Sequence, residues 1–286
     1  MSFYSLDGKT DLNAPVLVAA FDGWVDAGQA GTLAAEQLAT GGTVMATFDG
    51  DQIYDYRARR PTLDIVDGTL LSLDWPELNL RATTIGGRDL LILTGPEPDY
   101  RWRELSTDVA ELAKRLGVTS WVSLGAIPAA VAHTRPVPVL GTASVRGLLP
   151  DGVAQGPDGR LRVPSAAISV MELATSRAGI ASLGFYAQVP HYISAAYPAA
   201  AIELLNHVGR YLALEVPLGE LPTKALATRS LIDAAAAADE QTRAYVEKLE
   251  EMTDQAKLPT GDDLIADIEL YLREGGPRRN GGGLPN

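Results

Sequence analysis

The stretch PVLVAAFDGWVDAG, from Pro15 to Gly28, decides the fold class of this 286-residue chain. Its first half is a short, unbroken apolar run rich in Val, which is typical of a strand covered on both faces. Apolar residues then recur at helical spacing from Ala27 to Leu38, and a second apolar run covers Thr43 to Phe48. Strand, helix and strand in this order predict a βαβ unit with a parallel strand pair.

The same alternation continues along the chain. Further strands are predicted at residues 89–95, 119–125 and 181–186, and helices at residues 105–116, 165–178 and 198–212, the second of them capped by Ser165. Residues 50–88 lack a helical period, so we expect short strands or a β-arm there. The sequence therefore predicts an α/β fold with three layers, α/β/α, around a mostly parallel central sheet.

The segment after Val216 changes character. Steps of four and three residues link Leu231, Ala235, Ala238, Thr242, Tyr245, Leu249 and Met252, which indicates a heptad seam. Pro259 to Gly261 interrupts it, and a further short helix is expected over residues 264–272. We predict an α/β/α core over residues 1–216, a helical C-terminal extension over 217–274 and a disordered tail over 275–286.

Composition excludes several classes of protein. Thirty-six acidic and 24 basic residues give a net charge of −12, which disfavours nucleic-acid binding and docking to an anionic membrane. The chain has no Cys, so it has no disulfide framework and no thiolate metal site. Neither a signal segment nor a long apolar stretch is visible, and we expect a cytoplasmic protein.

Four predicted strand ends carry residues suited to binding or chemistry. In an open parallel sheet, ligands gather outside the carboxyl ends of the strands. The loops at those ends are FDGWVDAG, GPEPDY, GAIP and QVPHY. They supply the candidate ligand or interface rim, which consists of Asp22, Gly23, Trp24, Asp26, Gly95, Glu97, Gly125, His191 and Tyr192.

Each polar member of this rim also has a structural interpretation. Asp26 lies three residues before Gln29, which is the spacing of a capping box. Trp24 suits an interface as well as a ligand, and a Pro-flanked Glu97 or a lone His191 after a strand is common without chemistry. No catalytic residue is assigned. The usual nucleotide, zinc and nucleophile-elbow motifs are absent, so we expect neither a cofactor nor a metal.

Four segments together resemble the PAC2 family, proteins similar to proteasome assembly chaperone 2. These are PVLVAAFDGWVDAGQAG, LTGPEPDYRW, WVSLGAIPA and FYAQVPHYISAAYPAAAIELL, and the match spans roughly residues 3–216. The resemblance implies a fold similar to the phosphorylase/hydrolase-like fold, oligomeric assembly with a trimer as the expected form, and proteasome subunits as candidate partners. The chain ends Leu284-Pro285-Asn286, which departs from the hydrophobic–Tyr–any-residue ending through which some relatives dock.

Two functions from different classes follow. The leading hypothesis is a non-enzymatic, protein-binding factor of the PAC2 type that aids assembly or regulation of a larger complex. The alternative is an enzyme acting on a small nucleoside-like molecule at the rim, with Asp22, Trp24, Glu97 and His191 around it. Trp24, Trp102 and Tyr192 lie near segment ends, where aromatic anchors of a homo-oligomer would sit.

Overall fold

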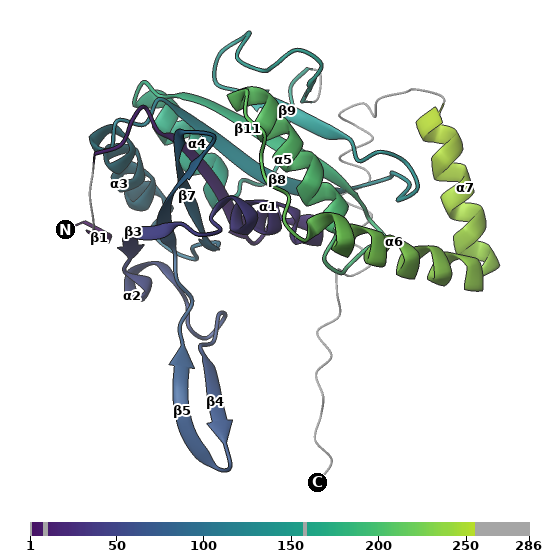
Figure 1. The fold of residues 1–286 in the computed structure, drawn as a ribbon, viewed down its shortest axis with the longest axis horizontal. Coiled ribbons are helices and arrows are strands. Elements are labelled where there is room, and N and C mark those ends of the chain that lie inside the picture. Colours follow the sequence, from purple (N-terminus) through teal and green to yellow (C-terminus); the bar gives the residue numbers. More distant parts are fainter. Residues whose placement is uncertain (1, 8–10, 157–158, 255–286) are drawn as a thin grey trace.

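A computed structural model describes residues 2–7, 11–156 and 159–254 (Figure 1). Within these ranges a nine-stranded sheet has the order β1-β3-β6-β7-β2-β8-β11-β9-β10. Its strands are β1 (Tyr4–Leu6), β2 (Val16–Asp22), β3 (Thr43–Phe48), β6 (Asn79–Ile85), β7 (Arg88–Pro96), β8 (Ser120–Ala129), β9 (Val139–Ala143), β10 (Ala154–Gln155) and β11 (Ala181–Pro190). The helices are η1 (Ala27–Gln29), α1 (Ala30–Leu38), α2 (Gly50–Ile53), α3 (Trp102–Arg115), α4 (Ala167–Arg177), α5 (Pro198–Leu212), α6 (Leu221–Ala238) and α7 (Glu240–Asp254).

The four central strands, β7, β2, β8 and β11, are parallel to one another, as expected for the core of the sheet. The predicted pairing of β2 with β3 is wrong, because β7 and β6 lie between them. β6 and β7 form a hairpin through Gly86 and Gly87, whose positive φ angles of 57° and 79° suit a two-residue turn. This local hairpin occupies the edge of β2 and makes that side of the sheet antiparallel.

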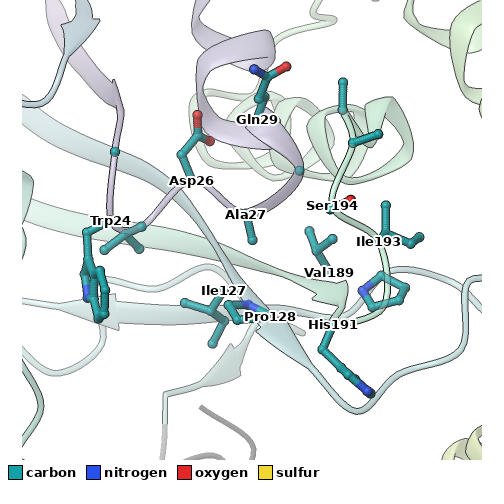
Figure 2. A pocket seen from close by; sticks show the side chains of 16 residues that line it. Trp24, Asp26, Ala27, Gln29, Ile127, Pro128, Val189, His191, Ile193 and Ser194 are labelled. Carbon is teal, nitrogen blue, oxygen red and sulfur yellow. The ribbon is translucent and has the colours of Figure 1, made fainter. Parts of the chain in front are cut away.

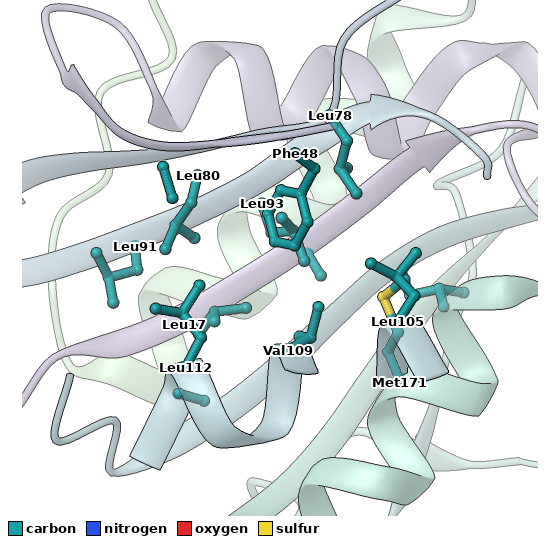
Figure 3. Close-up of a cluster of buried hydrophobic side chains, with 14 of the residues drawn as sticks. Leu17, Phe48, Leu78, Leu80, Leu91, Leu93, Leu105, Val109, Leu112 and Met171 are labelled. Atoms are coloured by element: carbon teal, nitrogen blue, oxygen red, sulfur yellow. The ribbon is translucent and has the colours of Figure 1, made fainter. Parts of the chain in front are cut away.

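Alternate residues of β2 face two different helical layers, which confirms the three-layer prediction. Leu17 packs in one apolar cluster with Val109 of α3 and Met171 of α4 (Figure 3). Val18 packs in a second cluster, which includes Leu38 of α1 and much of α5. Burial on both faces explains why the sequence of this strand is apolar throughout.

The β-arm expected between residues 50 and 88 is present as the hairpin β4 (Thr62–Val66) and β5 (Thr69–Asp74), which extends away from the body of the molecule (Figure 1). One of its faces is apolar and consists of Leu63, Ile65, Leu70 and Leu73, with exposed fractions of 43–66%. The described part of the chain leaves this arm face uncovered.

The C-terminal helices α6 and α7 are present, but they do not form one continuous heptad seam. Asp239 between them has extended φ/ψ angles, and its carboxylate caps α7 by accepting from the Thr242 amide at 2.7 Å. Leu231 of the expected seam is 72% exposed, whereas Leu249 is buried in a small apolar cluster that includes Ala132 of the loop after β8. An Asp with its strong N-cap preference starts a new helix here.

The division of the chain at residue 216 stays a prediction. The helix expected over 264–272 and the tail over 275–286 lie outside the described residues. Among the helices that the structure describes, none combines the length and apolar character needed to cross a membrane.

Candidate functional site

The carboxyl ends of the central strands meet at one edge of the sheet, as predicted, but two of the strands run further than expected. β8 continues to Ala129 and β11 to Pro190, because the two strands pair residue by residue along their whole length. Gly125 therefore lies inside β8, opposite Tyr186, and not in a loop after the strand. The rim proper begins at Asp22, Pro96, Ala129 and Pro190.

A cavity of about 420 Å³ opens at this rim, a size that suits a small ligand or a partner's side chains. Of the predicted residues, Gly23, Trp24, Asp26 and His191 line it (Figure 2). Its other walls are mostly apolar and include Ile127, Pro128, Val189, Pro190 and Ile193. Four of the nine rim residues thus line one cavity, while its apolar walls include strand residues that no motif singled out.

Asp26 lies at the edge of this cavity, but its carboxylate points toward α1 (Figure 2). One oxygen accepts from the Gly31 amide at 2.7 Å, and the other accepts from the Thr32 hydroxyl. Asp26 therefore caps a helix as expected, but the capping box with Gln29 is wrong. Gln29 has a left-handed φ of 54°, so the helix proper begins only after it. Burial raises the pKa of Asp26 to about 6, against the opposing effect of its hydrogen bonds.

Glu97 is buried and binds two backbone amides. Its Oε2 accepts from Trp24 N at 3.0 Å and its Oε1 from Ala167 N at 2.7 Å. The carboxylate thus caps the start of α4, where the helix dipole favours a negative group. The predicted cap, Ser165, instead donates its hydroxyl to the Ala166 carbonyl. A Cβ on Gly23 would lie 2.5 Å from the Glu97 carboxylate, so the close approach requires glycine.

His191 and Tyr192 connect the rim to the C-terminal helices. His191 Nδ1 lies 3.1 Å from the Ala129 carbonyl, and its Nε2 lies 3.2 Å from the Tyr245 hydroxyl. The Tyr192 hydroxyl accepts from the His133 amide at 2.9 Å and lies 2.7 Å from His133 Nδ1. Glu97 does not line the cavity that His191 lines, so the two do not form an acid–base pair across it.

His133 is the residue around which α6 docks. Its Nε2 lies 3.0 Å from Asp233 Oδ1, and its Nδ1 faces Tyr192, so a proton on Nε2 satisfies both contacts. Arg229 donates to the His133 carbonyl at 2.9 Å. Burial is the largest influence on the pKa of His133 and lowers it, which favours the neutral ring.

The neighbouring residues hold α7. Arg135 forms a two-point ion pair with Asp254 at 2.9 and 2.7 Å, and Thr134 donates to Glu250. The run His133-Thr134-Arg135 is thus a polar docking segment for the appendage, which packs on its own core. A polar tripeptide within a loop was the only signal in the sequence, and its partners lie about a hundred residues away.

The remaining predicted residues act through the backbone. The Asp22 carbonyl accepts from the Glu97 amide at 2.8 Å, while the Asp22 side chain is exposed. A Cβ on Gly95 would lie 2.2 Å from the Glu77 carbonyl oxygen, so β7 needs glycine there. Within the described ranges, no three His, Asp or Glu side chains gather in a group that could hold a metal ion.

The fold and the rim define a three-layer α/β protein with a protruding β-arm, a partly apolar hollow and a helical appendage docked beside it. The chain belongs to the PAC2 family, whose model matches residues 20–236. This confirms the resemblance expected from the sequence. A comparison with curated proteins found no match.

Solved structures agree with this assignment. The Mycobacterium tuberculosis unknown function protein Rv2714 is 33% identical, with 96% of this chain and 92% of that chain covered and a TM-score of 0.81. The M. tuberculosis proteasome-assembly chaperone homologue Rv2125 is 37% identical over 81% of this chain and 99% of that one, with a TM-score of 0.73. Pyrococcus furiosus PbaB, an archaeal proteasome activator, has a TM-score of 0.63 over 81% of this chain and 97% of that one, and at 16% identity it shows the shared fold.

Proposed function

We propose that this protein is a protein-binding factor that assists the assembly or regulation of a multisubunit complex, with proteasome α subunits as the first candidate partner. The observation that carries the proposal is the 37% identity to a proteasome-assembly chaperone homologue over almost the whole of that chain. An assembly factor needs surface that a partner can cover, and apolar side chains supply most of the free energy of such contacts.

Two exposed features support a protein partner. The apolar arm face, Leu63, Ile65, Leu70 and Leu73, has no cover within the described chain, and a contiguous exposed apolar patch usually marks an interaction site. Trp24 at the rim is 51% exposed. Tryptophan is enriched among the residues that dominate binding energy at interfaces.

The test is to mix the purified full chain with proteasome α subunits from the same cell and measure complexes by native mass spectrometry. We expect a defined complex at micromolar concentration, and weaker binding after Trp24→Ala. Leu226→Ala is the matched control, because Leu226 is an apolar residue on α6 that is even more exposed than Trp24 and does not line the cavity at the rim. Absence of any complex with α subunits, together with unchanged assembly of the proteasome in cells lacking the protein, would refute the proposal.

We also propose that the protein is a homo-oligomer, with a trimer as the expected form, and that the arm face contributes to its contacts. A two-stranded hairpin has marginal stability in water, so an apolar arm of this kind gains from a second copy. In the variant Ile65→Lys/Leu70→Lys, light scattering should show a smaller mass. Thr62→Lys/Ser72→Lys adds the same charge to the polar face of the same arm and should leave the mass unchanged. A wild type that is monomeric at micromolar concentration would contradict this part.

A further inference from the structure

A second cavity, of about 610 Å³, adjoins the rim on the other side of Trp24. Trp24, Val25 and Ile127 line both cavities. Trp24 and Ile127 are labelled in Figure 2, which shows the first cavity. The second cavity lies between helix α4 and strands β8, β9 and β11, and its volume lies in the range of small-molecule sites. Its walls are largely apolar and include Leu140, Leu161, Val163, Pro164 and Leu173.

The polar part of this cavity is built around Glu172. Ser123 donates to Glu172 Oε2 at 2.6 Å, and Ser123 itself accepts from the Trp121 indole at 2.8 Å. The Tyr186 hydroxyl also lies near Glu172, where it opposes the effect of burial on the pKa of that carboxyl group. On α4, residues Ser169, Glu172, Leu173 and Ser176 follow helical spacing and line the cavity together.

Two glycines make room for this arrangement. A Cβ on Gly125 or on Gly184 would lie 2.9 or 2.7 Å from the Tyr186 ring, so the ring can lie flat against β8 and β11 only because both positions are glycine. Tyr186 thereby presents its hydroxyl to Glu172. Gly125, predicted to be a rim residue, lies within β8 opposite Tyr186, and its lack of a side chain leaves room for the tyrosine ring.

The charge of the cavity is one-sided. None of the described residues that line it is Lys, Arg or His, and Glu172 is their one acid. Burial raises the pKa of Glu172, which is the effect of a carboxylate removed from water without a cation beside it. Such a group disfavours an anionic occupant and gains from a positively charged one, most of all in apolar surroundings.

We propose that this cavity binds a small molecule that carries a primary ammonium group on an apolar or aromatic body. The ammonium would lie at Glu172 and Tyr186, and the apolar body would contact Leu140, Leu173 and Trp24. An indole or phenyl ring beside Trp24 adds aromatic contact area. This site goes beyond the proposed role in assembly and does not depend on it.

Three indole probes of similar size but different charge test the proposal. Tryptamine is cationic, tryptophol is neutral and indole-3-propionate is anionic, and binding of each to the full chain is measured by titration calorimetry. We expect tryptamine to bind at least about tenfold more tightly than either of the others. Its affinity should fall as the pH is lowered through the pKa of Glu172, because the carboxyl group must lose its proton to pair with the ammonium. The other titratable group that faces Glu172 is Tyr186, from β11, which stays neutral over this range because burial raises its pKa.

Matched variants identify the cavity and the charge. Glu172→Gln should remove the preference for tryptamine, and Tyr186→Phe, which keeps the carboxylate, should retain it. Leu173→Trp should block this cavity, whereas Ser194→Trp narrows only the first cavity and should leave tryptamine binding unchanged. Equal binding of the three probes, no binding up to millimolar concentration, or a preference that survives Glu172→Gln in a folded variant would overturn the proposal.

Discussion

Replacing Glu97 tests whether this buried acid holds the structure or performs chemistry. Its carboxylate makes two charge-assisted hydrogen bonds, to Trp24 N at 3.0 Å and to Ala167 N at 2.7 Å. Each such bond contributes about 1.5–3 kcal/mol, and solvent can replace part of the bond to Trp24, which is half exposed. Glu97→Ala should therefore lower the free energy of unfolding by about 3–5 kcal/mol, which corresponds to a fall in Tm of roughly 6–20 °C.

Urea unfolding followed by circular dichroism measures this loss. Glu97→Gln keeps one carbonyl acceptor and should lose about half as much, because its NH2 group cannot accept from the second amide. Glu111→Ala is the control, since Glu111 is an exposed acid of α3 and its loss should change stability by less than about 0.5 kcal/mol. If the free energy of unfolding of Glu97→Ala lies within about 1 kcal/mol of the wild-type value, the two hydrogen bonds of Glu97 do not stabilise the rim as argued.

Three further predictions follow from the same region. The folded-state pKa of Asp26, raised to about 6, lies above its unfolded value, so its contribution to stability is present below pH 4 and lost as the pH rises through 6. Relative to Asp26→Asn, the wild type should lose about 3 kcal/mol over that interval in urea unfolding. Gly95→Ala should cost about 3 kcal/mol in the same assay, because the new methyl group would meet the Glu77 carbonyl. Tyr192→Phe leaves the His133 amide without its acceptor and should speed hydrogen exchange of α6 amides by at least about fivefold, because His133 contacts Asp233 of that helix.

Each of these has a result that would contradict it. A stability difference between the wild type and Asp26→Asn that stays constant from pH 4 to 7 would mean that Asp26 is not desolvated. Gly147→Ala is the control for Gly95→Ala, because Gly147 also has a positive φ but has open space around the added methyl group. Equal losses of stability in the two variants would mean that the contact with the Glu77 carbonyl does not contribute. Exchange in α6 that is unchanged by Tyr192→Phe would show that the contacts of His133 do not anchor this helix.

Much of the core was predictable because local patterns specify it. Unbroken apolar runs identified the central strands, and helical spacing identified α3 and α5, because burial on two faces or on one stripe leaves a direct mark on residue order. The pairing of β2 with β3 was not predictable in this way. The Gly86-Gly87 hairpin competes for the same strand edge, and a pattern of apolar residues does not say which neighbour a strand will choose.

The candidate site was predictable in place but not in role. Strand order and polarity located the rim, and four of its nine proposed residues line the first cavity. The sequence could not show that Glu97 binds two amides or that His191 contacts Tyr245, since these contacts join segments more than fifty residues apart. Glu172 was missed because a helix face of Ser, Glu and Leu is indistinguishable from an ordinary solvated face until the strands beneath it are placed.

The sequence by itself determined that this is an α/β protein of the PAC2 type with an acidic surface, no thiol chemistry, a β-arm and C-terminal helices. These properties follow from composition, periodicity and short motifs, which act over a few residues. Tertiary structure alone decided which acids bind backbone amides, where the appendage docks, and that two hollows share Trp24. The physical reason is that desolvation and hydrogen-bond geometry depend on neighbours distant in the chain, and only the folded arrangement brings those neighbours together.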